Sequence, residues 1–199
     1  LIIPVSEWEI KTACQQAKMW QNKKILPGPI AINVSTIQFS RHSLSKVIRE
    51  ILKETQLSSS CIELEITETI FIEYNDKLYK EIDELQKMGI RLVIDDFGTG
   101  YSSLSYLKHL PIYKIKIDKA FIDNCHDDYL DQTIINAITT IAHKLNIKVI
   151  AEGVENETQL NMLQEQGIDG IQGFYFSQPL TVEHFELQLK TGILQKALT

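Results

Sequence analysis

Short apolar runs recur along the chain, and stretches with the apolar spacing of helices lie between them. Six runs predict strands, at residues Ile30–Ser35, Ile62–Thr67, Arg91–Asp96, Tyr113–Asp118, Ile147–Glu152 and Ile171–Phe176. Successive runs start 22 to 34 residues apart, which leaves room for one helix after each strand. This spacing suits parallel βα units better than hairpins.

Capping residues and glycines mark the ends of the expected helices. Ser6 with Glu9 has the spacing of a capping box and predicts the start of a first helix. Asn75 or Asp76 is expected to cap another helix, and Gly89 to end it in the left-handed conformation. Three further helices are expected over residues 134–145, around 160–163 before Gly167, and over 181–192.

Six alternating strand and helix units predict an α/β fold with a mainly parallel sheet. An open doubly wound sheet and a closed (β/α)₈ barrel both fit this order. No GxGxxG turn follows the first strand, which argues against a dinucleotide site of the Rossmann type. A barrel usually takes about 250 residues and eight strands, so a barrel interpretation requires two more units than the six found here.

Length and composition predict one domain over residues 1–199, because 44% of the 199 residues are hydrophobic and can form a sizeable core. No run approaches the roughly 18 to 20 apolar residues of a membrane span, and the opening LIIPVSEWEI has no features of an export signal. The three cysteines have no CxxC spacing and suggest neither a disulfide framework nor a zinc cluster. A cytoplasmic location is therefore expected.

The charge balance limits the partners. A net charge of −6 argues against binding to duplex nucleic acid, which requires a basic surface. A phosphate-bearing ligand would need metal ions to offset the repulsion.

The chain also begins without methionine, on an apolar segment that leads into a helix, so we expect it to continue from an upstream segment.

A polar residue stands near the carboxyl end of every predicted strand. These residues are Asn33, Glu65, Asp95 with Asp96, Lys116, Glu152 and Gln172. A single acid at such a place is usually a helix cap or a solvated loop residue. In parallel βα folds, however, the carboxyl ends of the strands meet where active sites lie, so the six-fold coincidence favours a site.

Four carboxylates in one place would repel one another unless divalent cations share their oxygens. Such hard oxygen ligands suit Mg²⁺, Mn²⁺ or Ca²⁺. Asp95 and Asp96 can both reach a metal only if the strand bends there, which Gly98 and Gly100 would permit. Two ions about 3.5 to 4 Å apart are the usual device for phosphodiester hydrolysis, and Lys116 would hold the water or neutralise charge.

Other polar residues have simpler interpretations. Asp118 is expected to cap a helix, and Glu63 and Lys114 to be structural polar groups deeper along their strands. Glu155 is either a support for the site or a cap. The segment GTGYSSLSYL is a loop leading into a helix packed by Leu104 and Leu107, or else a lid that lines the substrate. The five histidines are expected to be surface or structural residues.

Six motifs occur in order along the chain: NVS at 33–35, ELEITET at 63–69, DDFGTGYSSLSYL at 95–107, KIDKAFI at 116–122, AEGVE at 151–155 and QGFYFSQPL at 172–180. Together they resemble bacterial EAL domains, the phosphodiesterases that hydrolyse cyclic di-GMP. The resemblance covers essentially the whole chain.

The resemblance implies a TIM-like (β/α) barrel of the EAL type that converts cyclic di-GMP to linear pGpG with Mg²⁺ or Mn²⁺, in a two-metal site. The implied metal ligands are Asn33, Glu65, Asp95, Asp96 and Glu152. Lys116 would lie beside the attacking water, Gln172 would support that centre, and Glu68 would brace the DDFGTG loop. The implied substrate and loop residues are Phe97, Gly98, Thr99, Gly100 and Pro179.

One departure from the family is that the triplet Glu-Ala-Leu, whose glutamate is a metal ligand, does not occur. We therefore expect the C-terminal three-quarters of an EAL domain, with about six βα units and the first two missing, and with impaired activity. The alternative is a non-catalytic cyclic di-GMP receptor or regulatory module.

Exposed edges at strands 30–35 and 171–176 predict homodimers or other edge-mediated association. An upstream sensory or cyclase-like domain is a further expected partner.

Overall fold

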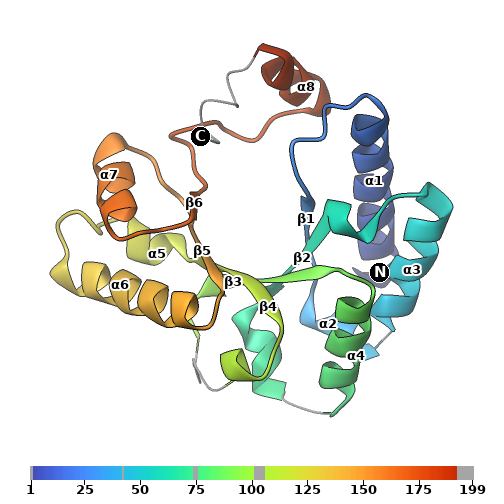
Figure 1. Ribbon diagram of the computed structural model, residues 1–199, viewed down its shortest axis with the longest axis horizontal. Coiled ribbons are helices and arrows are strands. Elements are labelled where there is room, and N and C mark those ends of the chain that lie inside the picture. The colour runs from blue at the N-terminus through green and yellow to red at the C-terminus, as the bar shows by residue number, and fades with distance from the viewer. Residues whose placement is uncertain (1, 42, 74–75, 101–105, 192–199) are drawn as a thin grey trace. The chain divides into compact units, whose positions relative to one another are not determined.

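The computed structural model describes residues 2–41, 43–73, 76–100 and 106–191 (Figure 1). The chain divides into two compact units, residues 1–114 and 115–199. Strand β4 (Ile112–Ile117) runs across this boundary. Whether the chain is a single domain, as its length suggests, stays a prediction.

The first unit alternates strands with helices in the expected way. Its elements are α1 (Ile2–Asn22), β1 (Ile30–Asn33), α2 (Thr36–Arg41), α3 (Leu44–Thr55), η1 (Ser59–Cys61), β2 (Ile62–Thr67), η2 (Glu68–Glu73), α4 (Asp76–Lys87), β3 (Arg91–Phe97), η3 (Tyr106–Lys108) and the start of β4. β1 pairs with β2 and β2 with β3, all parallel, with Ile30 opposite Ile62 and Glu63 opposite Arg91. The predicted parallel βα arrangement is therefore confirmed here.

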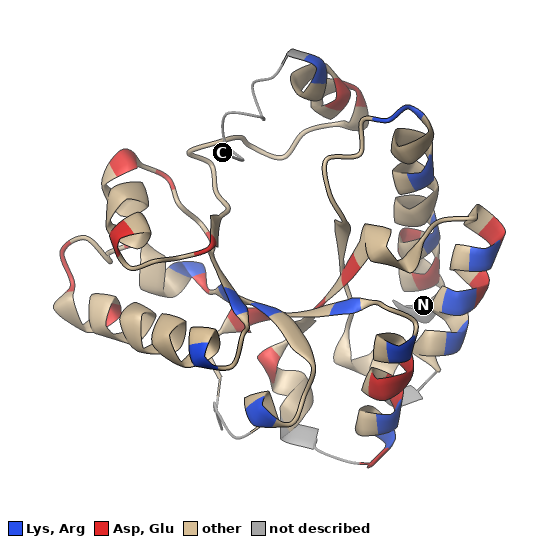
Figure 2. Cartoon of the chain, viewed as in Figure 1, with Lys and Arg blue, Asp and Glu red and all other residues tan. Residues whose placement is uncertain are grey.

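Amphipathic helices supply the rest of the first unit's core. α1 buries Ile10, Cys14 and Ala17, which recur at helical spacing, while α3 buries Ile48 and Ile51. Charged residues lie along α3 and α4 (Figure 2). Although α1 has 21 residues, no helix in the described part of the chain is both long and apolar enough to cross a membrane.

The second unit holds the rest of β4 and then α5 (Lys119–Ile122), α6 (Tyr129–Lys144), β5 (Lys148–Ala151), α7 (Glu157–Glu165), β6 (Gly170–Ile171) and α8 (Val182–Thr191). β5 and β6 are parallel, with Ile150 opposite Gly170. Asp118 caps α5, because its carboxylate accepts the Ala120 N–H at 2.7 Å. This confirms the prediction for Asp118.

Two sequence predictions are wrong at the ends of elements. Ser6 and Glu9 lie inside α1, which begins at Ile2 and has Pro4 in its first turn, where a missing N–H costs little. The sixth strand ends at Ile171 instead of Phe176, because the Phe176 N–H bonds back to Gly173 O at 3.2 Å in a turn.

Between β1 and β2 the structure has two α-helices, α2 and α3, where one was expected. Gly89 follows α4 with φ +80°, so the predicted left-handed stop is confirmed. Gly167, which follows α7, is also left-handed, with φ +75°. Asp76 is the first residue of α4. The other predicted cap, Asn75, lies outside the described residues, as do Leu104 and Gly192.

Candidate functional site

Three of the predicted site residues share one face at the carboxyl ends of neighbouring strands in the first unit. The register places Asn33 opposite Glu65 and Thr67 opposite Asp95. Paired residues in neighbouring strands point to the same face, and so do residues two apart in one strand. Asn33, Glu65 and Asp95 therefore lie on the same side of this part of the sheet, where Asn33 is exposed and the two acids are half-buried.

Asp96 joins Asp95 because the backbone leaves the regular strand conformation. Its φ is +52°, in the left-handed region that few residues with side chains adopt. Carboxylate oxygens of Asp95 and Asp96 consequently lie within 4.8 Å of each other, which alternation along a regular strand would prevent. The expected bend is present, at Asp96 itself and at Gly98 (φ +100°).

The loop after β3 is held by Glu68, the first residue of η2. Glu68 is buried, and its Oε2 accepts the Gly98 N–H at 3.2 Å. A Cβ at Gly100 would lie 3.5 Å from the same oxygen, so the loop backbone packs directly against this carboxylate. Phe97 is buried and Thr99 Oγ1 donates to Asp96 O at 2.9 Å, which closes the turn.

Deeper along the same strands, Glu63 is neutralised by two cations. Its side chain is only 4% exposed, and its oxygens lie 2.6 Å from Lys114 Nζ and 3.5 Å from Arg91 Nη1. These contacts confirm the prediction that Glu63 and Lys114 are structural polar groups, since a buried carboxylate is tolerated when it is paired in this way.

In the second unit, Lys116 and Glu152 form an ion pair. Lys116 Nζ lies 2.6 Å from Glu152 Oε1, and both side chains are largely buried, at 7% and 17% exposure. Backbone pairing fixes their positions, because the Glu152 N–H donates to Ile117 O at 3.1 Å. The pair thus combines an ionised oxygen donor with an ammonium group.

Backbone hydrogen bonds hold the segment that follows Glu152. The Gln172 N–H donates to Ala151 O at 2.8 Å and the Val154 N–H to Gln172 O at 3.2 Å, while the Gln172 side chain is exposed. Glu155 bonds to Lys119 and does not cap α7, because Asn156 does. Lys119 was not among the predicted site residues. The signal for it in the sequence is its spacing of four from Asp123, whose Oδ1 lies 3.7 Å from Lys119 Nζ.

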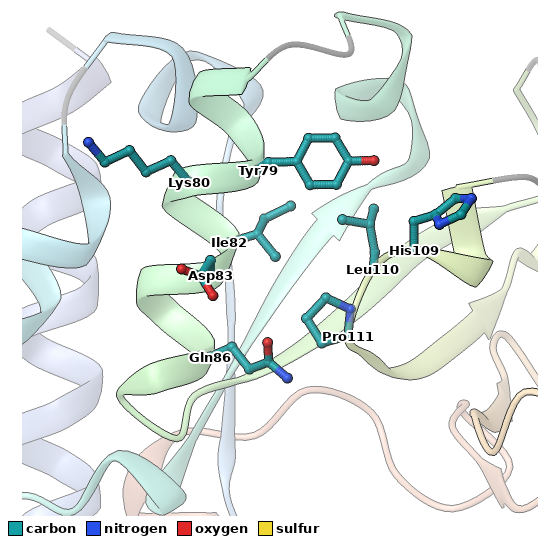
Figure 3. Close-up of a pocket in the computed structure, with 8 residues that line it drawn as sticks. All are labelled: Tyr79, Lys80, Ile82, Asp83, Gln86, His109, Leu110 and Pro111. Carbon is teal, nitrogen blue, oxygen red and sulfur yellow. The ribbon is translucent and has the colours of Figure 1, made fainter.

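Pro179, predicted to line the substrate, is exposed in the connection before α8. A pocket of about 430 Å³ lies elsewhere, in the first unit between α4 and the segment that leads into β4 (Figure 3). Its lining residues are Tyr79, Lys80, Ile82, Asp83, Gln86, His109, Leu110 and Pro111. None of these is a predicted site residue, so the pocket and the candidate site are separate features of this unit.

The profile of the EAL domain family matches residues 1–179. Signaling protein YkoW of Bacillus subtilis is 44% identical over 94% of this chain, and the bifunctional diguanylate cyclase/cyclic di-GMP phosphodiesterase MucR of Pseudomonas aeruginosa is 38% identical over 92%. The match covers 23% of YkoW and 27% of MucR, so the chain spans about a quarter of the length of these relatives.

Solved structures give the same result for the fold. The EAL domain of Mycobacterium smegmatis DcpA matches 96% of this chain and 86% of its own length, with 31% identity and a TM-score of 0.90. The MucR phosphodiesterase in complex with c-di-GMP matches 93% of this chain and 75% of its own, with 38% identity and a TM-score of 0.88. The manganese/cy-diGMP complex of Klebsiella pneumoniae BlrP1 covers 87% of this chain and 45% of that one, with 29% identity and a TM-score of 0.76. These similarities confirm the predicted α/β fold of the EAL type.

Proposed function

The chain belongs to the EAL domain family, and from this premise we propose that it hydrolyses cyclic di-GMP to linear pGpG with the help of divalent cations. The observation that carries the proposal is the left-handed turn at Asp96, which puts oxygens of two adjacent aspartates within 4.8 Å of each other. A protein holds such a conformation at a functional site more often than elsewhere. The Lys116–Glu152 ion pair, at 2.6 Å, adds further support.

We propose that the metal ligands are Asn33, Glu65, Asp95, Asp96 and Glu152. Their carboxylate and amide oxygens fit Mg²⁺ or Mn²⁺, and the manganese complex of BlrP1 is consistent with this choice. Two such cations, when bound, supply an activated water and positive charge for the phosphate oxygens.

The chain's other residues orient the substrate and the water. The Lys116 ammonium, held by Glu152, would direct N–H groups at the phosphate, with Gln172 beside it. Residues 97–100, which Glu68 supports, and Pro179 would line the substrate. The water oxygen bonds to phosphorus and the water gives up a proton. The bond from phosphorus to O3′ breaks and O3′ takes up a proton, so the product is a linear dinucleotide with a 5′-phosphate.

The proposal extends to the domain's context. We place the reaction in the cytoplasm, which suits the three free cysteines. A homodimer is the proposed assembly. The domain would work alongside a sensory or cyclase-like domain, as the names of MucR and of the oxygen sensor protein DosP of Escherichia coli indicate for those relatives.

The test is incubation with cyclic di-GMP and Mg²⁺ or Mn²⁺, followed by chromatography of pGpG. It uses this chain and a version extended at its N-terminus by a segment with the Glu-Ala-Leu triplet, which the printed sequence does not contain. We expect turnover at least in the extended form, and a loss of about 100-fold or more in Glu152→Gln but not in the exposed control Glu157→Gln. Binding without turnover in both forms would select the receptor function; absence of both binding and turnover would contradict the proposal.

A further inference from the structure

Two buried polar atoms next to the Asp95–Asp96 loop have no hydrogen-bond partner among the described residues. They are the Tyr106 hydroxyl and Glu68 Oε1. Tyr106 is 6% exposed and Glu68 is 5% exposed, so little solvent reaches either side chain. Leaving a buried donor and a buried acceptor unpaired is costly, and natural structures seldom do it without a reason.

The two side chains belong to the same small cluster. Phe71, from the same short helix as Glu68, stacks on the Tyr106 ring with 4.4 Å between ring centroids and 21° between planes. Burial and then the nearby Glu68 carboxylate raise the pKa of the Tyr106 phenol far above its usual range. Tyr106 therefore stays a neutral O–H donor beside a carboxylate that needs one.

We propose that Tyr106 is a positioning residue: its O–H donates to Glu68 Oε1, and this fixes the carboxylate so that Oε2 holds the Gly98 N–H. The consequence for the site is indirect. Gly98 follows Asp96 by two residues, and the turn between them sets the direction of the aspartate side chains. The effect of Tyr106 on catalysis rests on the proposed function, whereas its effect on the position of the Glu68 carboxylate does not.

The arrangement explains how a strained turn persists. Asp96 and Gly98 both have positive φ, which the surrounding structure must hold in place. A carboxylate with one hydrogen bond can rotate, whereas one bonded through both oxygens cannot. Helix η2 thus holds Gly98 through Glu68 and Tyr106 through Phe71.

The first experiment measures amide hydrogen exchange by NMR in Tyr106→Phe, which keeps the ring on Phe71 and removes only the hydroxyl. We expect exchange at Gly98 to become roughly tenfold faster, the effect of losing one hydrogen bond to a charged group, while Val93 in the middle of β3 is unchanged. The matched control is Tyr79→Phe on α4, which should leave Gly98 unaffected. Unchanged exchange at Gly98 in Tyr106→Phe would overturn the proposal.

The second experiment tests whether Tyr106 acts through Glu68. Mn²⁺ affinity is titrated in the wild type, Tyr106→Phe, Glu68→Ala and the double variant. We expect Tyr106→Phe to weaken Mn²⁺ binding by about tenfold in the wild type and to have no further effect in Glu68→Ala. Additive losses would show that Tyr106 acts only through general packing and would overturn the proposal.

These readouts separate the inference from the proposed function. If the wild type neither hydrolyses nor binds cyclic di-GMP while Tyr106→Phe still frees the Gly98 amide, the proposed function fails and the positioning role stands. If hydrolysis is present and Gly98 exchange does not respond, the positioning role fails alone.

Discussion

The backbone conformation and the charge of Asp96 both destabilise the folded protein at the candidate site. A positive φ is uncommon for a residue with a side chain, although aspartate tolerates it better than most. The turn also places two negative charges within 4.8 Å of each other. Both features work against stability in the metal-free protein, and both are what a cation would require.

Asparagine at position 96 separates these effects, because it tolerates the left-handed conformation and removes one charge. We expect Asp96→Asn to raise the free energy of unfolding in EDTA by up to about 1 kcal/mol through relief of repulsion. Mn²⁺ affinity should fall at least tenfold. Urea denaturation and Mn²⁺ titration check the two parts; an unchanged Mn²⁺ affinity would remove Asp96 from the proposed ligands.

The buried thiols are predicted to be unreactive. Burial raises the pKa of Cys14 to about 11, and burial followed by the charge of Asp131 raises that of Cys125 to about 11. At pH 8 only about one thiol in a thousand would be the reactive thiolate. With a disulfide reagent in native conditions, half-buried Cys61 should react first, and Cys61→Ser should remove that phase. Three equally fast thiols would contradict this prediction.

At the scale of elements, the bounds of β2 and β3 were predicted closely, because apolar residues recur along each strand between clear breaks. The prediction was wrong at the end of β6, where three consecutive aromatic residues, Phe174, Tyr175 and Phe176, are typical of a strand. There the chain turns because Gly173 packs against the backbone of Val154, a contact between segments nearly 20 residues apart. Local periodicity contains no information about such a contact.

The candidate site divides in the same way. Strand parity was enough to group Asn33, Glu65 and Asp95 on one face. The direction of Asp96 depends on a backbone angle that no residue pattern specifies. The prediction that Glu68 supports the loop containing Gly98 was based on the family resemblance. Tyr106 was not predicted, because its proposed role depends on tertiary packing.

Gly173 gives a direct test of the turn after β6. A Cβ there would lie 2.1 Å from Val154 O and 2.4 Å from Val154 N, so Gly173→Ala must displace backbone. We expect it to lower the free energy of unfolding by about 2 to 3 kcal/mol, measured by chemical denaturation. Gly28→Ala is the control, because a Cβ at Gly28 meets nothing within 4 Å and should change stability by less than about 0.5 kcal/mol. Equal effects would refute the packing argument.

Asp169 joins α6 to the start of β5. Burial alone would raise its pKa, but hydrogen bonds from the Val149 N–H (2.8 Å) and the His143 ring (2.9 Å) outweigh burial, so the pKa is lowered. Its stabilising contribution is therefore full above the unfolded pKa of about 3.9 and is lost as pH falls through the lower folded value.

Removal of the Asp169 carboxylate should make the free energy of unfolding depend less strongly on pH in the acid range. Asp169→Ala is expected to lower stability at pH 7 by about 1 to 2 kcal/mol through its two lost hydrogen bonds, and by less below pH 3. Urea denaturation between pH 2 and 7 measures the difference. A loss that is constant across this range would contradict the assignment, because it would show that the charge of Asp169 contributes nothing.

At the scale of the whole molecule, the proposed ligands of the cations include Asp95, Asp96 and Glu152. An ion that binds only the folded protein raises its stability by about 2.7 kcal/mol when its concentration is a hundred times Kd. For a chain of 199 residues this predicts a rise of roughly 5 to 10 °C in Tm with saturating Mn²⁺. Asp95→Asn and Glu152→Gln should each abolish most of the rise, whereas Glu157→Gln should retain it. If Asp95→Asn removes the rise but Glu152→Gln keeps all of it, Glu152 is not a ligand and the proposed ligand set is wrong.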